Sequence, residues 1–210
     1  MYMTRSTAAP VSGLFSKVCL LLTPGLALTA LGAYAGQGIT NGWHILVLAL
    51  LFLGGSFAAR AIARWNKFYG FITLMVWTFI TGLFLGRGNT VFLAFPWVVG
   101  ITAGCGAIGA LSGRDFSNWG NWLLFALLGL IVAGIVNIFV SFGSVGTMIF
   151  SGIGMVVFAG FFIFDFFRLS RSENTWDSAF DLTINLFLDY LNFLLYLLRF
   201  LEAFLGSSDD

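Results

Sequence analysis

The chain has 210 residues, of which 59% are hydrophobic and only 9% are charged, against about 25% charged residues in an ordinary soluble domain. So few charges do not cover a water-facing surface, and a net charge of +1 lacks the basic field that attracts nucleic acid, so no nucleic-acid partner is expected. Because a helix needs about 20 apolar residues to cross a membrane, residues 1–210 are predicted to form a single transmembrane domain within the lipid bilayer.

Seven apolar stretches follow one another with only short charged or glycine-rich breaks between them. They predict an all-α integral membrane protein, a bundle of seven transmembrane helices. The first stretch contains Pro24-Gly25 and shows no small-residue cleavage pattern after a short apolar core, so we expect it to be a retained helix. The predicted spans are 16–37, 43–63, 68–86, 90–111, 119–140, 145–168 and 178–204.

The positive charges predict an orientation, since loops on the cytoplasmic side of a membrane are enriched in lysine and arginine. With a cytoplasmic N-terminus, that side collects eight of the ten basic residues, leaving only Arg87 and Arg199 outside. The short termini and the absence of a eukaryotic retention signal favour a bacterial cytoplasmic membrane. The eight are Arg5, Lys17, Arg60, Arg64, Lys67, Arg114, Arg168 and Arg171.

Glycines gather inside the predicted fourth and sixth spans, where small residues let helix backbones approach closely. We therefore expect tight helix packing at these positions. They are Gly100, Gly104, Gly106 and Gly109 in the fourth span and Gly152, Gly154 and Gly160 in the sixth.

Two aspartates lie within the apolar sequence itself, Asp165 among phenylalanines of the sixth span and Asp189 among leucines of the seventh. A carboxylate inside a membrane costs a few kcal/mol on insertion scales and marks a functional site by default. Both aspartates are therefore candidate functional residues.

The seventh span carries a polar stripe, whose members follow one another at intervals of four, four, four, three, four and three residues. At 100° per residue they occupy an arc of only ~120°, so we expect this helix to lie centrally, with its stripe facing protein or water. Interhelical hydrogen bonds that fix the packing are the alternative role, above all for Asn185 and Tyr196. The stripe consists of Asp177, Asp181, Asn185, Asp189, Asn192, Tyr196 and Arg199.

Consecutive antiparallel helices can bring Asp165 and Asp189 together. Two carboxyl groups that meet where water is excluded do not both ionise cheaply, so they would share a proton and titrate as a unit. Arg60 and Arg64, at the end of the second span, are candidate partners for an ionised Asp165, with membrane orientation as their alternative role.

No cofactor is expected. His44 is the only histidine, which argues against a transition-metal site. Calcium differs, since its oxygen ligands could come transiently from the carboxylates and amides near Asp165 and Asp189, although they are too few for a tight cage.

At these residues the chain resembles the Bax inhibitor-1 family, the transmembrane Bax-inhibitor-motif proteins. The resemblance implies a pH-sensitive calcium leak in which Asp165 and Asp189 form the sensor, Arg64 rather than Arg60 is the latch, and six helices wrap the seventh. The residues that carry it are Gly134-Ile135-Val136-Asn137-Ile138-Phe139, Phe162-Ile163-Phe164-Asp165, Asn185-Leu186-Phe187-Leu188-Asp189-Tyr190-Leu191-Asn192-Phe193 and Leu197-Leu198-Arg199.

Two departures from that family's pattern stand out. Phe166-Phe167 follows Asp165 where Thr-Gln is common, and Leu53 stands where some bacterial relatives carry an acidic residue. The second departure leaves the sensor intact and leaves open whether an ion path passes along the second span.

Two other functions compete with a leak pathway. An intramembrane aspartyl protease also places one aspartate on each of two adjacent helices, but Asp189 lacks the Gly-x-Gly that precedes it in such enzymes, and no Pro-Ala-Leu follows. A non-conducting interaction or regulatory protein of the membrane is the other alternative. The sequence therefore favours a protein that is not an enzyme.

Overall fold

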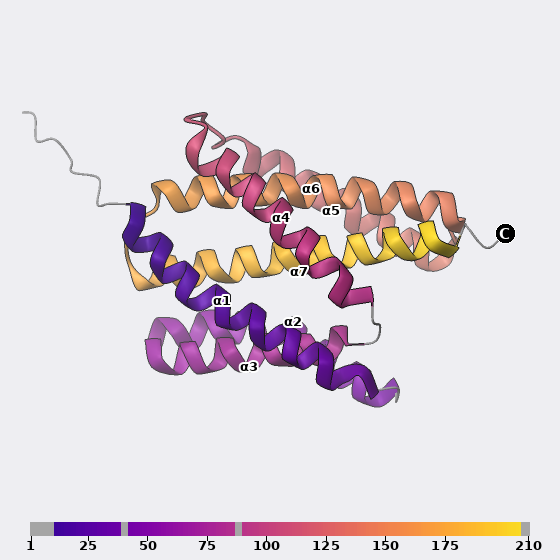
Figure 1. Ribbon diagram of the computed structural model, residues 1–210, viewed down its shortest axis with the longest axis horizontal. Helices are drawn as coiled ribbons and strands as arrows, with labels where there is room; N and C mark the ends of the chain where they lie inside the picture. The colour runs from indigo at the N-terminus through magenta and orange to yellow at the C-terminus, as the bar shows by residue number, and fades with distance from the viewer. Residues whose placement is uncertain (1–10, 39–41, 87–89, 207–210) are drawn as a thin grey trace, which may run out of the picture. The chain divides into compact units, whose positions relative to one another are not determined.

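A computed structural model describes residues 11–38, 42–86 and 90–206 of the chain (Figure 1). These residues form seven α-helices and one 3-10 turn, with no strand among them, which confirms the predicted all-α class. The elements are α1 (Val11–Ala35), η1 (Gly36–Gly38), α2 (Gly42–Trp65), α3 (Lys67–Leu85), α4 (Thr90–Leu111), α5 (Trp119–Phe139), α6 (Gly143–Arg171) and α7 (Trp176–Gly206).

The helices differ from the predicted spans mainly at their ends. α1 runs without a break through Pro24, so the first span is one helix. The last turn of α6 includes Arg168 and Arg171, and cations there are favoured by the helix dipole. At the start of α7 the Thr175 hydroxyl accepts a hydrogen bond of 3.1 Å from the Ser178 backbone N–H, which is how an N-cap residue satisfies the first turn.

Five of the helices, α1, α3, α5, α6 and α7, are long and apolar enough to cross a membrane over their described residues. α2 and α4 contain 24 and 22 residues, which at about 1.5 Å per residue also matches a hydrocarbon core of about 30 Å. The chain is thus an integral, multi-pass membrane protein.

The chain divides into two compact units, and α6 and α7 contribute to both. Among the described residues, unit 1 comprises 11–38, 42–84 and 168–184, and unit 2 comprises 85–86, 90–167 and 185–206. Whether they act as the single domain predicted from the sequence stays a prediction.

Unit 1 is held together by close helix contacts around α3. Gly32 of α1 and Gly82 of α3 face each other so closely that a Cβ on Gly82 would lie 2.9 Å from the Gly32 Cα. Nearby, the buried Thr29 hydroxyl lies 3.0 Å from the Thr78 carbonyl oxygen. On the other side of α3, the Trp77 indole N–H donates to the Phe52 carbonyl of α2 at 3.0 Å.

Unit 2 uses glycines at its helix crossings. A Cβ on Gly109 of α4 would collide with the backbone of α6 at Ile163, and one on Gly160 of α6 would lie 2.7 Å from Leu123 of α5. Tight packing is therefore confirmed at these positions and at Gly106 and Gly154. At Gly100, Gly104 and Gly152 the prediction of tight packing is wrong, because an added Cβ meets open space there.

α7 is the most buried of the five candidate spans. Half of its most apolar window is buried, against 11–39% in the other four. Its apolar positions outside the polar stripe, such as Leu186, Leu191 and Leu194, are at most 1% exposed. α7 is therefore buried on more than its polar face, and its position at the centre of a seven-helix bundle stays a prediction.

Candidate functional site

The polar stripe of α7 passes from exposed ends to a buried middle. The side chains of Asp177 and Asp181, at its start, are 61% and 41% exposed. Asp189, three turns further, is only 8% exposed, and Arg199 near the helix end is exposed again. The same stripe therefore contains acids in two very different environments.

Asp165 is the second buried acid, with 4% of its surface exposed. Its neighbours on α6 are clamped by other helices of unit 2. A Cβ added to Gly106 of α4 would lie 3.1 Å from the ring of Phe166. A Cβ added to Gly120 of α5 would lie 2.8 Å from the ring of Phe164. The two residues that flank Asp165 are therefore packed against neighbouring helices, in keeping with the burial of the carboxyl group.

α6 and α7 pack directly against each other within unit 2. The ring of Tyr196 lies against Gly154, and its centroid is 5.8 Å from that of Phe158. One turn further along, the Phe162 and Phe193 centroids are 5.9 Å apart. The helices are thus antiparallel neighbours with a defined register.

That register relates the two buried acids, Asp165 and Asp189. From the Phe158–Tyr196 contact, seven residues forward along α6 lead to Asp165 and seven residues back along α7 lead to Asp189. Seven residues are about two helical turns, so each acid lies on nearly the same face as the ring it is counted from. The buried acids therefore lie within about one helical turn of the same level of the α6–α7 interface.

Other members of the stripe have structural partners. The Asn192 amide donates to the Leu188 carbonyl of its own helix at 2.8 Å, and Tyr196 lies between the rings of Phe150 and Phe158. Asn185 is half-buried. A role for Asn185, Asn192 and Tyr196 along an ion path stays a prediction.

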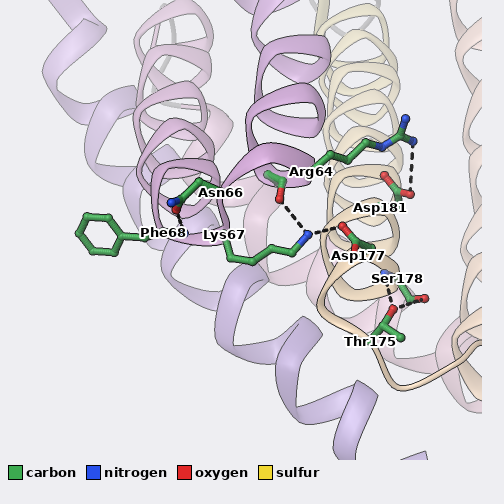
Figure 2. A network of polar contacts seen from close by, with 9 residues as sticks. Arg64, Asn66, Lys67, Phe68, Thr175, Asp177, Ser178 and Asp181 are labelled. Carbon is green, nitrogen blue, oxygen red and sulfur yellow. Dashed lines mark hydrogen bonds and ion pairs between the residues drawn. The ribbon is translucent and has the colours of Figure 1, made fainter.

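Unit 1 contains a network of ion pairs at the corner between α2 and α3 (Figure 2). Lys67 forms an ion pair with Asp177 and donates to the Ala63 carbonyl at 2.8 Å. Arg64 Nη2 lies 3.9 Å from Asp181 Oδ2. These contacts connect the α2–α3 corner to the first two turns of α7.

This network was not predicted from the sequence, in which Lys67 was expected only to contribute to membrane orientation. Part of the signal was present: Asp177 and Asp181 are four residues apart, so they lie on one side of α7, and Arg64 and Lys67 are close together at the break between α2 and α3. The proximity of the two segments, however, depends on the folded unit.

The two candidate latch arginines differ in exposure. Arg60 is half-buried, whereas the Arg64 side chain is 72% exposed and its ion pair is with Asp181. The predicted latch on Asp165 stays a prediction. Leu53, at the position of the missing acid, is 62% exposed, so a side chain at this place on α2 lies outside the core.

No group of three or more His, Cys, Asp or Glu side chains lies close enough to hold a metal ion anywhere in the described residues. A role for calcium near Asp165 and Asp189 stays a prediction.

Comparison with known proteins places the chain in a family. Residues 11–206 match the family model described as "Inhibitor of apoptosis-promoting Bax1". An uncharacterized protein of Deinococcus radiodurans is 34% identical over 98% of this chain and 95% of its own length. Protein LIFEGUARD 1 of Arabidopsis thaliana is 42% identical over 41% of this chain and 36% of its own.

A viral relative points the same way. The Golgi anti-apoptotic protein of vaccinia virus strain Lister is 41% identical over 44% of this chain and 38% of its own length. Because the family model spans nearly all of the described residues, the resemblance found in the sequence is confirmed. The chain belongs to the Bax inhibitor-1 family of membrane proteins.

Proposed function

We propose that this protein is a pH-sensitive calcium leak pathway gated by Asp165 and Asp189. The observation that carries the proposal is the burial of both acids, 4% and 8% exposed, near one level of the α6–α7 interface in unit 2. Membership in the Bax inhibitor-1 family supports it. Calcium and protons are the proposed partners of the site, with calcium as cargo.

The mechanism follows from the cost of charge in a buried site. Two ionised carboxylates at one level of a helix interface repel each other strongly, whereas a shared proton removes one charge and allows a hydrogen bond between them. Protonation therefore holds α6 and α7 together at this level. Where repulsion between the acids dominates, loss of the proton separates the helices and leaves two carboxylates facing a passing cation.

Arg64 is the proposed latch. Its pair with Asp181 is long and exposed, and exposed ion pairs contribute only about 0.2–1 kcal/mol. Arg64 is thus held weakly enough to exchange partners. With an arginine on the ionised Asp165, protonation would release the latch, so the sign of the pH response distinguishes latch release from repulsion between the acids.

The test is calcium flux into liposomes that contain the purified protein, measured across pH 5–8. The wild type should conduct with a pH-dependent rate, and the double variant Asp165→Asn/Asp189→Asn should conduct with a rate that no longer follows pH. Asp115→Asn is the matched control, because Asp115 is an exposed acid of unit 2 whose bond to the Ser117 N–H an asparagine can also accept. Flux equal to that of empty liposomes would refute the proposal.

We further propose the bacterial cytoplasmic membrane as the location, with the N-terminus in the cytoplasm. The basic residues of the α2–α3 corner and of the α6 end support this orientation through the enrichment of positive charge inside. Reporter fusions after Lys67 and Ser172 should both report a cytoplasmic position. An external signal at either site would reverse the topology.

The second candidate is a membrane protein that regulates partners without conducting ions. The printed name of the vaccinia relative, Golgi anti-apoptotic protein, favours a regulatory activity in that protein. The family is of a channel or regulator type and not a known enzyme family, so we propose no catalytic activity. If the Asp165→Asn/Asp189→Asn variant kept its regulatory effect on partners, this candidate would be favoured over the leak.

A further inference from the structure

A cavity of about 460 Å³ lies among α5, α6 and α7 of unit 2, and its α7 residue, Arg199, lies ten residues beyond the buried Asp189. Its size falls within the range of small-molecule sites. Asn137 of α5, Thr147 of α6 and Arg199 of α7 contribute its polar groups, and Ile131, Ile135 and Phe150 contribute apolar walls. The proposed leak mechanism uses none of these residues.

Arg199 brings to this cavity a positive charge that forms no ion pair among the described residues. No hydrogen bond or ion pair joins its side chain to any residue in the described ranges, and none of the residues that line the cavity is acidic. Glu202 lies three residues further along α7 but forms no ion pair with it within 4 Å. A guanidinium beside apolar walls at a membrane helix end is best satisfied by an anion.

Two neutral groups add hydrogen-bonding capacity. The Asn137 Oδ1 atom accepts the Phe142 N–H at 3.2 Å, which fixes the amide so that its two N–H donors are left for another acceptor. The Thr147 hydroxyl lies one turn into α6, where the positive end of the helix dipole adds to the potential. All three polar groups thus favour an acceptor of negative charge.

The surface next to the cavity is apolar. Ile131, Val132 and Ile135 on α5 are 50%, 61% and 52% exposed, and only 11% of the apolar window of α5 is buried. An anionic group in the cavity could therefore continue into an acyl chain along α5.

From this geometry we infer that the cavity is a binding site for a phosphate group, with Arg199 as its principal ligand and Asn137 and Thr147 as further donors. A phosphate offers the several acceptor oxygens that a guanidinium and an amide can share. It can come from a phospholipid headgroup, with its acyl chain on α5, or from inorganic phosphate. The inference does not depend on calcium conduction or on the buried acids.

The experiment uses purified, delipidated full-length protein in detergent and follows its thermal unfolding during titration. The probes are phosphatidylglycerol, diacylglycerol with the same acyl chains but no phosphate, and inorganic phosphate against chloride at equal ionic strength. Phosphatidylglycerol should raise the Tm and diacylglycerol should not. A shift with phosphatidylglycerol alone identifies a headgroup site, and a shift with inorganic phosphate as well shows that the free anion suffices.

Three variants test the assignment of residues. Arg199→Gln should weaken the apparent affinity for phosphatidylglycerol by about tenfold or more, since it removes a charged hydrogen-bonding group. Arg114→Gln, which removes an exposed arginine from the α4–α5 loop of the same unit, should leave it unchanged. Asn137→Asp keeps an acceptor for the Phe142 N–H but places a negative charge in the cavity, so it should also weaken binding.

Three results would overturn the assignment. They are an equal shift with diacylglycerol, wild-type affinity in both Arg199→Gln and Asn137→Asp, and an equal loss in Arg114→Gln, which would indicate general surface charge. Asn137→Asp keeps the test decisive if Arg199→Gln does not fold.

Discussion

Two pairs of acids, one in each compact unit, lie in opposite environments. Asp177 and Asp181 in unit 1 are 61% and 41% exposed and face Lys67 and Arg64. Asp165 and Asp189 in unit 2 are 4% and 8% exposed and lie between helices packed through glycines and aromatic rings. Three of these four acids belong to α7, so position on a helix does not by itself decide what an acid does.

The difference lies in the cost of ionisation. An exposed acid is stabilised by water whether or not its cation is present, so its ion pair adds only about 0.2–1 kcal/mol and weakens with salt. A buried acid depends on the protein for every interaction that water would have supplied. The exposed acids are therefore suited to adjustable contacts at a helix end, and the buried acids to a response to protons.

Among these predictions, disturbing the contact between α6 and α7 should have the largest effect on stability. Gly154→Ala places a methyl group against the ring of Tyr196, and overpacking of this kind costs about 1–3 kcal/mol. Gly152→Ala, two residues away, meets open space and should be neutral or stabilising by up to about 1 kcal/mol, because alanine favours helix more than glycine does.

Thermal unfolding of both variants in detergent measures this difference. Gly154→Ala should also alter the pH profile of calcium flux, since it displaces the interface that holds the buried acids. Equal Tm values for the two variants would contradict the packing that the register is based on.

Arg64 should give the next largest effect. If Arg64 is the latch, Arg64→Ala should raise the basal calcium leak about tenfold, the size expected for loss of one charged hydrogen bond. Arg60→Ala should leave the leak nearly unchanged. Asp181→Asn distinguishes the observed partner of Arg64, Asp181, from the proposed partner, Asp165. It removes the exposed ion pair and should lower the leak or leave it unaltered. If Asp181→Asn raised the leak as much as Arg64→Ala, the arginine would act through the exposed acid.

The smallest effect should come from the Lys67–Asp177 ion pair. A double-mutant cycle with Lys67→Met and Asp177→Asn should give a coupling free energy of about 0.2–1 kcal/mol at low salt. The coupling should shrink as salt shortens the Debye length from about 10 Å at 0.1 M to about 3 Å at 1 M. Unfolding at the two salt concentrations checks it, and coupling that persisted undiminished at high salt would mean that water is excluded from this corner.

Much of the fold was accessible from the sequence because the membrane limits the choices. Every backbone polar group must be satisfied within the bilayer, so each apolar stretch of about 20 residues had to be a helix. The predicted spans agree with the helices within a few residues, except at the start of α1, at Val11. The boundaries at Gly143 and Thr175 depend on a turn and a cap that apolar periodicity does not detect.

The buried acids were also accessible, because an acid within an apolar run stands out. Their position near one level of the α6–α7 interface was not, since it depends on which rings meet Tyr196. The same limit applied to the glycines: Gly152 and Gly154 look alike in the sequence, yet only Gly154 faces another helix. The cavity beside Arg199 could not be predicted, because its walls come from three helices.

The most direct test of the central claim is a double-mutant comparison of the pH dependence of calcium flux in liposomes. Asn keeps the shape and hydrogen bonding of Asp but does not titrate, so Asp165→Asn and Asp189→Asn should each flatten the response between about pH 6 and 8. Members of a coupled pair are non-additive, so the double variant should add little to either single one. If both single variants kept the wild-type pH profile, or if their effects summed, the buried acids would not act as one titrating unit.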